Sequence, residues 1–397
     1  MKLAHRISTI KPSPTLAIMA KANALRAEGR DIISFSAGEP DFDTPQHIKL
    51  AAIKAIEDGF TKYTAVGGID ELKDAIAGKL MRDNNLSYRR NEIVVSCGAK
   101  HTLYNLAQIL FEEGDEVIIP APYWVSYSDI VVLTGATPVI VQTSETSDFK
   151  MSPEQLKKAM TGKTKAVILN SPCNPTGAAY TKADIEALAA VIEETDIVVI
   201  SDDIYEKILY DGFEFFSIAS CSESLKKRTV VINGVSKAYA MTGWRIGYAA
   251  GPEEIIAAMV KLQSQNTSNP TSISQKASVE ALNGDQAPVA QMAVEFEKRR
   301  SVIVNALNNI SGLTCRMPQG AFYAFPNVSG LYGRSLGGKI INGSSDVAAY
   351  LLDAANVAVV PGADFGDDRY IRLSYATSMA LIEEGTKRIK AAIENPA

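Results

Sequence analysis

Lys237 is the residue whose surroundings in this sequence most favour covalent chemistry. It stands in the segment 236–248, SKAYAMTGWRIGY, which follows the apolar run 229–233. If that run is a buried strand of a parallel sheet, the lysine can face a cleft at the strand's carboxyl end. A lysine amine becomes a useful nucleophile when burial or nearby cations lower its pKa toward neutrality. A lone lysine in such a place is more often structural or solvated, so the position alone decides nothing.

Two acids and an amide follow other apolar runs in the same way. Asp202 and Asp203 come directly after the run 197–201, and Asn174 lies in the turn 170–177, NSPCNPTG, after the run 165–169. Two acids after a strand more often begin a helix, and the prolines and glycine indicate only a turn.

Two further turns have chemically useful residues at strand ends. The segment 96–100, SCGAK, leads from an apolar run into a predicted helix, and backbone N–H groups at a helix start can bind phosphate. Trp124 lies in the segment 121–127, APYWVSY, and is one of 2 tryptophans. Taken singly, such glycine turns and aromatics are mostly structural.

Together these segments resemble the class I aminotransferases, which are fold-type I pyridoxal-phosphate enzymes. The likeness is closest in 236–248 and runs from the N-terminal arm to the last predicted strand. Within the family the sequence looks most like the bacterial aspartate aminotransferases, some of which also act on prephenate. The resemblance implies an α/β fold with a large domain on a mainly parallel, helix-covered sheet and a smaller α+β domain.

The resemblance also implies a set of residues that bind pyridoxal 5'-phosphate. Lys237 would hold the cofactor and carry a proton between substrate and cofactor, Asp202 would face the ring nitrogen, and Tyr205 and Asn174 would contact the ring hydroxyl. Arg245 would pair with the phosphate. The remaining implied cofactor contacts are Gly98, Ala99, Lys100, Trp124, Ser236 and, from the neighbouring subunit, Tyr63. The catalytic residues would be Lys237, Asp202 and Tyr205.

Substrate contacts follow from the same resemblance. Arg372, in the segment 371–376, would grip the α-carboxylate with two parallel hydrogen bonds, and the Gly38 backbone would approach the same group. Trp124 and Asn174 would line the substrate site. Lys11 and Lys100 stand where the bacterial branch binds the distal carboxylate, since no equivalent arginine stands out in 263–274.

Two positions depart from the usual family pattern. Cys173 stands where many relatives have asparagine, and Asp203 where many have glutamate. We interpret both as neutral variations and do not expect Cys173 to be a nucleophile.

The elements that must position these residues alternate between two periods. Helical patterns separate short apolar runs, and continuous apolar strands between helices indicate a largely parallel sheet covered on both faces. The runs are 92–96, 116–120, 137–141, 165–169, 197–201 and 229–233. After residue 252, longer helices and short strands predict a second unit. We predict an arm over 1–15, a large cofactor-binding domain over 46–285, and a small domain over 16–45 and 286–397.

Composition limits the remaining possibilities. The chain has 397 residues, a net charge of −5, 4 cysteines and 3 histidines. We expect no nucleic-acid partner, because no basic excess is present, and the basic runs 226–228 and 298–300 are predicted to be solvated. The scattered cysteines and histidines predict no metal site. No apolar run reaches the roughly 20 residues of a membrane helix, and the polar N-terminus does not resemble an export signal, so a cytoplasmic protein is expected.

These observations predict a homodimeric aspartate aminotransferase that transfers an amino group from L-aspartate to 2-oxoglutarate by a ping-pong mechanism, with prephenate as a possible further substrate. Three alternatives remain open. The first is another reaction with the same cofactor, such as that of a lyase, a decarboxylase or an aromatic or histidinol-phosphate aminotransferase. The second is a nicotinamide-dependent dehydrogenase, although no Gly-x-Gly-x-x-Gly follows an early strand. The third is a non-catalytic binding protein.

Overall fold

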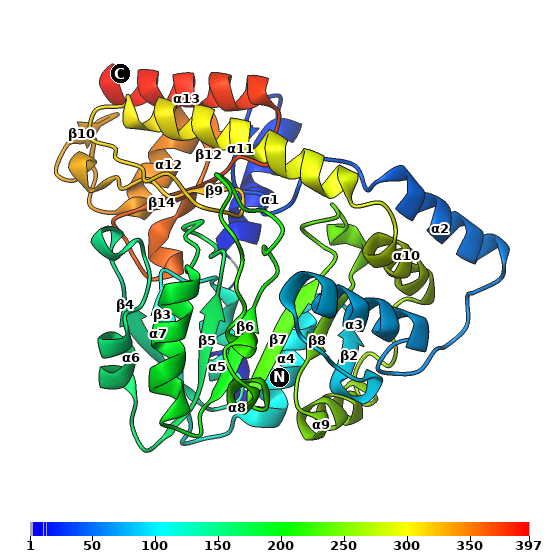
Figure 1. Ribbon diagram of the computed structural model, residues 1–397. Helices are drawn as coiled ribbons and strands as arrows, with labels where there is room; N and C mark the ends of the chain where they lie inside the picture. The colour runs from blue at the N-terminus through cyan, green and yellow to red at the C-terminus, as the bar shows by residue number, and fades with distance from the viewer. Residues whose placement is uncertain (1–2, 11, 13, 397) are drawn as a thin grey trace.

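A seven-stranded sheet forms the centre of the larger part of the molecule (Figure 1). The computed structural model describes residues 3–10, 12 and 14–396. The strands lie in the order β2-β8-β7-β6-β5-β3-β4. They are β2 (Ile93–Ser96), β3 (Glu116–Ala121), β4 (Thr137–Gln142), β5 (Thr164–Asn170), β6 (Val198–Asp202), β7 (Thr229–Gly234) and β8 (Gly247–Ala250). All pairings are parallel except those of β8 with its two neighbours. The predicted α/β class with a mainly parallel sheet is confirmed.

Strand β8 is the element of this sheet that the apolar runs did not predict. Its sequence, GYAA, lacks the β-branched residues that mark the other strands. Small residues are needed there, because a Cβ on Gly247 would lie 2.2 Å from the backbone nitrogen of Ala99. Strand β8 therefore packs closely against the turn that precedes helix α4 (Ala99–Leu110).

Helices cover both faces of the sheet, as the continuous apolar strands require. On β3, Val117 and Ile119 pack in one core cluster with Leu106 of α4, whereas Ile118 packs in another with Leu188 of α7. Successive side chains of a strand point to opposite faces, so each face needs its own helical layer. The helices of this part are α3 (Asp70–Asn84), α4, α5 (Ser126–Val132), α6 (Pro153–Ala159), α7 (Lys182–Glu193), α8 (Glu223–Lys226), α9 (Glu253–Gln263) and α10 (Ser272–Asn283).

A second unit lies against one end of this sheet and combines the chain's beginning with its end (Figure 1). Its three-stranded sheet has the order β13-β14-β9, and β1 pairs in parallel with β12. Helices α11 and α13 pack side by side over it. The elements are α1 (Pro14–Ala27), β1 (Ile33–Ser34), α11 (Ala287–Asn308), β9 (Tyr323–Ala324), β10 (Ser335–Leu336), β11 (Lys339–Ile340), α12 (Ser344–Ala354), β12 (Val357–Ala358), β13 (Val360–Pro361), β14 (Ile371–Ser374) and α13 (Met379–Glu394). Helix α2 (Gln46–Glu57) packs on α10 of the larger part. The residue boundaries proposed for arm and domains stay a prediction.

The expectation that the basic run 298–300 is solvated was wrong for two of its residues. Arg299 is 6% exposed and Arg300 3% exposed. Arg299 donates to Asp41 at 2.6 Å and lies over the Phe42 ring, and Arg300 donates to Asp211 at 2.7 Å. A guanidinium can be buried when a carboxylate pairs with it and an aromatic face covers it. Asp41 and Asp211 are both far from residues 298–300 in sequence, so the sequence of this run alone could not predict that two of its residues are buried.

Among the described residues, no helix combines the length and apolar character required to cross a membrane.

Candidate active site

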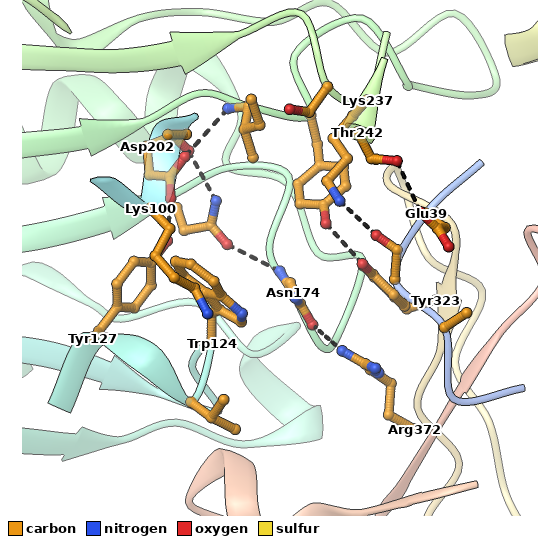
Figure 2. A pocket seen from close by; sticks show the side chains of 18 of the residues that line it. Glu39, Lys100, Trp124, Tyr127, Asn174, Asp202, Lys237, Thr242, Tyr323 and Arg372 are labelled. Atoms are coloured by element: carbon orange, nitrogen blue, oxygen red, sulfur yellow. Dashed lines mark hydrogen bonds between the residues drawn. The ribbon is translucent and has the colours of Figure 1, made fainter. Parts of the chain in front are cut away.

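A cavity of about 380 Å³ opens where the carboxyl ends of the central strands face the second unit (Figure 2). This is the place where parallel sheets bind ligands. Of the predicted site residues, the cavity wall contains Gly38, Ala99, Lys100, Trp124, Asn174, Asp202, Tyr205, Ser236, Lys237, Arg245 and Arg372. Gly98 lies directly behind Arg245. Tyr63 is 91% exposed and is not part of the wall, and Lys11 lies outside the described residues.

Lys237 follows β7 and extends into the cavity. Its Nζ donates a hydrogen bond to the Gly38 carbonyl oxygen, which belongs to the segment after β1. Burial lowers the pKa of Lys237 to about 8, with Glu39 and Asp202 opposing the shift and Arg372 and Arg245 adding to it. The amine is therefore much closer to neutrality than an exposed lysine at physiological pH, which is the condition for nucleophilic attack.

Asp202 ends β6 and faces the cavity opposite Glu39 (Figure 2). Its Oδ2 accepts a hydrogen bond from the Tyr127 hydroxyl at 2.5 Å. Burial raises the pKa of Asp202 to about 6, while the bonds from Tyr127 and the Ile204 amide and the charge of Lys237 oppose the shift. A cation placed beside this carboxylate would stabilise its charged form, because its present hydrogen bonds replace only part of the hydration that burial removes.

Asp203 directly follows β6 and is not part of the cavity wall, in keeping with the alternation of successive side chains in extended backbone. Its Oδ1 accepts a hydrogen bond from the Ser201 hydroxyl at 2.7 Å, whereas its buried Oδ2 has no partner. Burial and the charge of Glu206 raise the pKa of Asp203 to about 8. Of the two adjacent acids, Asp202 is thus the one that can meet a ligand.

The raised pKa of Asp203 gives a stability prediction. Between the ordinary value of 3.8 and about 8, the folded protein holds a proton on this carboxyl that the unfolded chain releases. Stability must therefore fall as pH rises through that window. Replacing Asp203 with asparagine should raise the melting temperature at pH 8 by about 1–3 °C relative to the wild type and change it less at pH 5. Calorimetry at both pH values would give the melting temperatures, with the exposed Asp196→Asn variant as control. A melting temperature of Asp203→Asn that falls further below the wild type at pH 8 than at pH 5 would contradict this prediction.

Arg372, on β14, is buried and spans the two units. Its Nη1 donates to the side-chain oxygen of Asn174 at 3.0 Å, and its Nη2 donates to the Ser36 carbonyl at 2.8 Å. Its guanidinium lies 4.6 Å from the Tyr323 ring centroid and 4.9 Å from that of Phe365. The buried Nε has no partner. A guanidinium clamped in this way, with donor capacity to spare, is suited to binding a carboxylate.

Two tyrosines, Tyr205 and Tyr323, line the cavity between Arg372 and Lys237. The hydroxyl groups of Tyr205 and Tyr323 are 2.7 Å apart and form a hydrogen bond. Burial raises the pKa of Tyr205 well above its ordinary value, so this phenol keeps its proton. A Cβ on Gly38 would lie 2.9 Å from the Tyr323 hydroxyl, so a larger residue there would displace this phenol.

The opposite end of the cavity is rich in donors for an anion. Gly98 precedes α4 with φ of +92°, and a Cβ there would lie 2.4 Å from Nη2 of Arg245. Arg245 donates to the Thr242 carbonyl at 2.9 Å, which fixes the guanidinium beside the helix start. Lys100 lies over the Trp124 ring, 4.9 Å from its centroid, and burial lowers the pKa of its amine. Backbone N–H groups at a helix start, a guanidinium and an ammonium together make a phosphate-binding set.

Several described residues of the wall were not predicted from the sequence, and those with polar side chains are Glu39, Tyr127, Asn170, Thr242 and Tyr323. Thr242, Tyr127 and Asn170 lie in the segments 236–248, 121–127 and 170–177, and Glu39 follows Gly38, so proximity to predicted residues was the available signal. Tyr323 had no such signal, because its place on a short predicted strand indicates core packing equally well. Cys173 was not expected to be a nucleophile, and burial raises the pKa of its thiol to about 11.

Comparisons with known proteins agree with this geometry. The family model "Aminotransferase class I and II" matches residues 30–389. The chain is 52% identical over 394 residues to a Bacillus subtilis protein named aspartate aminotransferase, covering 99% of both chains. It is 53% identical to a Nitrosomonas europaea aspartate/prephenate aminotransferase, covering 98% of this chain and 99% of the relative.

Solved structures give the same result. The crystal structure of the aspartate aminotransferase from Rhizobium meliloti has a TM-score of 0.97 at 50% identity and covers 100% of both chains. The Thermus thermophilus aspartate aminotransferase solved with maleate has a TM-score of 0.93 at 42% identity, covering 99% of this chain and 100% of that one.

Proposed function

We propose, because this chain belongs to the class I and II aminotransferase family, that it transfers the amino group of L-aspartate reversibly to 2-oxoglutarate, giving oxaloacetate and L-glutamate. The observation that carries the proposal is the meeting of Lys237, Asp202 and Arg372 in one cavity. Together they provide an amine, a buried carboxylate and a carboxylate-binding guanidinium. The names of the relatives support aspartate as donor and support prephenate as a further substrate of the oxo-acid half-reaction.

The residues present fit pyridoxal 5'-phosphate. The anion-binding end formed by Gly98, Ala99 and Arg245 suits its phosphate, with Ser236 and Lys100 beside it. Asp202, whose burial leaves its charge poorly compensated, suits a protonated ring nitrogen. When bound, this cofactor supplies an aldehyde and an electron-accepting ring. Asn174 and Tyr205 would contact its ring hydroxyl, and Trp124 would provide a flat wall.

Lys237 would have two roles at one atom. Its Nζ would hold the cofactor, and a pKa of about 8 favours that role near neutral pH. With substrate bound, the same Nζ would accept a proton from the substrate carbon and return it elsewhere. A group with a pKa near the working pH performs both halves of such a transfer well.

Arg372 would bind the α-carboxylate of the substrate. Arg372 lines the cavity, its Nη atoms donate to Asn174 and to the Ser36 carbonyl, and its buried Nε has no partner. Two parallel hydrogen bonds to one carboxylate would fix the substrate's orientation relative to Lys237.

The distal carboxylate would be bound by Lys100 and Lys11. Lys100 is on the cavity wall, and Lys11 lies outside the described residues, so its role rests on the sequence resemblance. Replacing Lys11 with alanine should reduce kcat/KM for aspartate about 30-fold or more, the result of losing about 2 kcal/mol for a desolvated charge pair. Alanine as donor carries no such charge and should be nearly unaffected. Steady-state kinetics with saturating cofactor tests this against Lys21→Ala, and equal losses for both donors would remove Lys11 from the site.

We further propose a homodimer with shared active sites, in which Tyr63 reaches the cofactor phosphate of the partner. Tyr63 is 91% exposed in the single chain, and α2 exposes 53% of Leu50 and 47% of Ile53. A partner subunit would cover such apolar surface. We propose a cytoplasmic location, which suits the free thiols of Cys97, Cys173, Cys221 and Cys315.

A panel of amino donors tests the proposed reaction. Aspartate, glutamate, alanine, phenylalanine and histidinol phosphate would each be offered with 2-oxoglutarate and oxaloacetate, and prephenate with glutamate or aspartate. Aspartate with 2-oxoglutarate should give the highest kcat/KM among the amino-donor pairs. A higher value for an aromatic donor or histidinol phosphate would reassign the substrate class, and decarboxylation or elimination without amino transfer would reassign the reaction.

A further inference from the structure

A short strip of backbone, residues 36–39, connects the two cationic groups that the proposed reaction requires. The Ser36 carbonyl accepts a hydrogen bond from Nη2 of Arg372 at 2.8 Å, and the Gly38 carbonyl accepts one from Nζ of Lys237. At the end of the strip, the Glu39 carboxylate accepts a hydrogen bond from the Thr242 hydroxyl at 2.8 Å. Thr242 belongs to the same segment as Lys237, five residues further along the chain. The Glu39–Thr242 bond thus ties the strip directly to the lysine segment.

The strip is also held from behind. Asp41 accepts a hydrogen bond from Arg299 of α11 at 2.6 Å, and Arg299 is 6% exposed and covered by the Phe42 ring. A buried, paired guanidinium restricts the backbone on either side of its partner. The Glu39 carboxylate is therefore held by Thr242, and the chain two residues further on is anchored by the Asp41–Arg299 pair.

Glu39 stands out in the charge distribution of the cavity. Of the residues that the structure describes, four cations line the wall, Lys100, Lys237, Arg245 and Arg372, against two acids, Asp202 and Glu39. Asp202 lies deep in the cavity with Tyr127 bonded to it, whereas Glu39 lies on the other side of Lys237, at the exposed rim (Figure 2).

We propose that Glu39 is a positioning residue whose carboxylate, fixed by Thr242, stabilises the protonated form of Lys237 against the cations that surround it. The inference rests on the proposed function, in which Lys237 must both accept and release a proton. Glu39 does not touch the reacting atoms in this account. It acts through its charge on the amine.

The electrostatic surroundings of Lys237 support this role. Burial is the largest influence and lowers the pKa of Lys237 to about 8, and the charges of Arg372 and Arg245 act in the same direction. Glu39 is the largest influence in the opposite direction, followed by Asp202. The Gly38 carbonyl and the rings of Tyr205 and Phe322 also face the amine. Without Glu39 the protonation equilibrium of Lys237 would shift further toward the neutral amine, and the amine would hold a transferred proton less well.

The proton affinity of Lys237 can be measured without catalysis. The full-length protein, depleted of cofactor, would be labelled with trace acetic anhydride between pH 6 and 10, and peptide mass spectrometry would give the labelling midpoint of each lysine. Glu39→Gln should lower the Lys237 midpoint by about 0.5–1 pH unit. Thr242→Val, which frees the carboxylate but keeps its charge, should lower it by less. The exposed Lys163 serves as an internal reference.

Matched variants separate charge from structure. Glu39→Asp retains the charge and should stay nearer to the wild type than Glu39→Gln, and Glu254→Gln removes an exposed acid on α9 and should change nothing. A Lys237 midpoint that is unchanged or raised in Glu39→Gln overturns the proposal. If Glu39→Gln does not fold, an unshifted midpoint in Thr242→Val overturns it instead. Borohydride labelling of wild-type protein with bound cofactor separates this inference from the proposed function. If Lys237 is labelled but its acetylation midpoint does not shift in Glu39→Gln, this inference is rejected and the proposed function stands. If Lys237 is not labelled, the proposed function itself is rejected.

Discussion

Replacing Lys237 with alanine should reduce amino transfer at least about a thousandfold, the largest effect that we expect from any single substitution. The variant loses the amine that holds the cofactor and the group that moves the substrate proton, and both are the same atom, Nζ. Among the described residues, the other lysine of the cavity wall is Lys100, which is held over the Trp124 ring and is not expected to substitute. Single-turnover measurements with aspartate would give the residual rate.

Cofactor binding should survive this substitution in part. The phosphate contacts proposed for Gly98, Ala99 and Arg245 do not involve Lys237. The variant should therefore retain pyridoxal phosphate with reduced affinity, measurable by absorbance after gel filtration. The exposed Lys261→Ala is the matched control and should behave as the wild type. A Lys237→Ala protein with turnover within tenfold of the wild type would contradict the assignment.

Replacing Asp202 with asparagine should have the second-largest effect. We expect a loss of about 100- to 1,000-fold in kcat, equivalent to about 3–4 kcal/mol of transition-state stabilisation. The amide keeps the shape of the side chain and still accepts the hydrogen bond from Tyr127, but it cannot stabilise a positive charge on the ring nitrogen. Fold and most cofactor binding should be preserved.

The neighbouring acid provides the control for this experiment. Asp203 is equally buried but is not part of the cavity wall, so Asp203→Asn should leave kcat within a few-fold of the wild type. Pre-steady-state kinetics with both variants would separate the two roles. Near-normal activity in Asp202→Asn together with a collapse in Asp203→Asn would show that the wrong acid had been chosen.

The sequence could predict the strands and the turns that follow them, because both depend on local pattern. Apolar runs such as 229–233 identify buried strands, and the carboxyl ends of parallel strands meet at one edge, which brings Asp202 and Lys237 together. The assignment of particular roles came from the family resemblance. Nothing in the local residues of Arg372 separates a substrate ligand from a structural arginine.

The missed features depend on contacts between distant segments. Strand β8 was missed because small residues are required where it packs on the turn before α4, and small residues carry no strand signal. Arg299 was expected in solvent, although it is buried by Asp41 and Phe42 from a segment more than 250 residues away in sequence. Tyr323 forms a hydrogen bond with Tyr205, and only the tertiary fold brings these two residues together. Periodicity describes neighbours along the chain and carries no information on such pairs.

The most direct test of the central claim is the site of cofactor attachment. The purified full-length protein, saturated with pyridoxal phosphate, would be reduced with sodium borohydride, which converts a reversible lysine–cofactor linkage into a stable secondary amine. Proteolysis and mass spectrometry would then locate the added mass. We predict a yellow protein whose visible band disappears on reduction, with the label on the peptide that contains Lys237 and on no other. Label on another lysine, or none at all, would contradict the account.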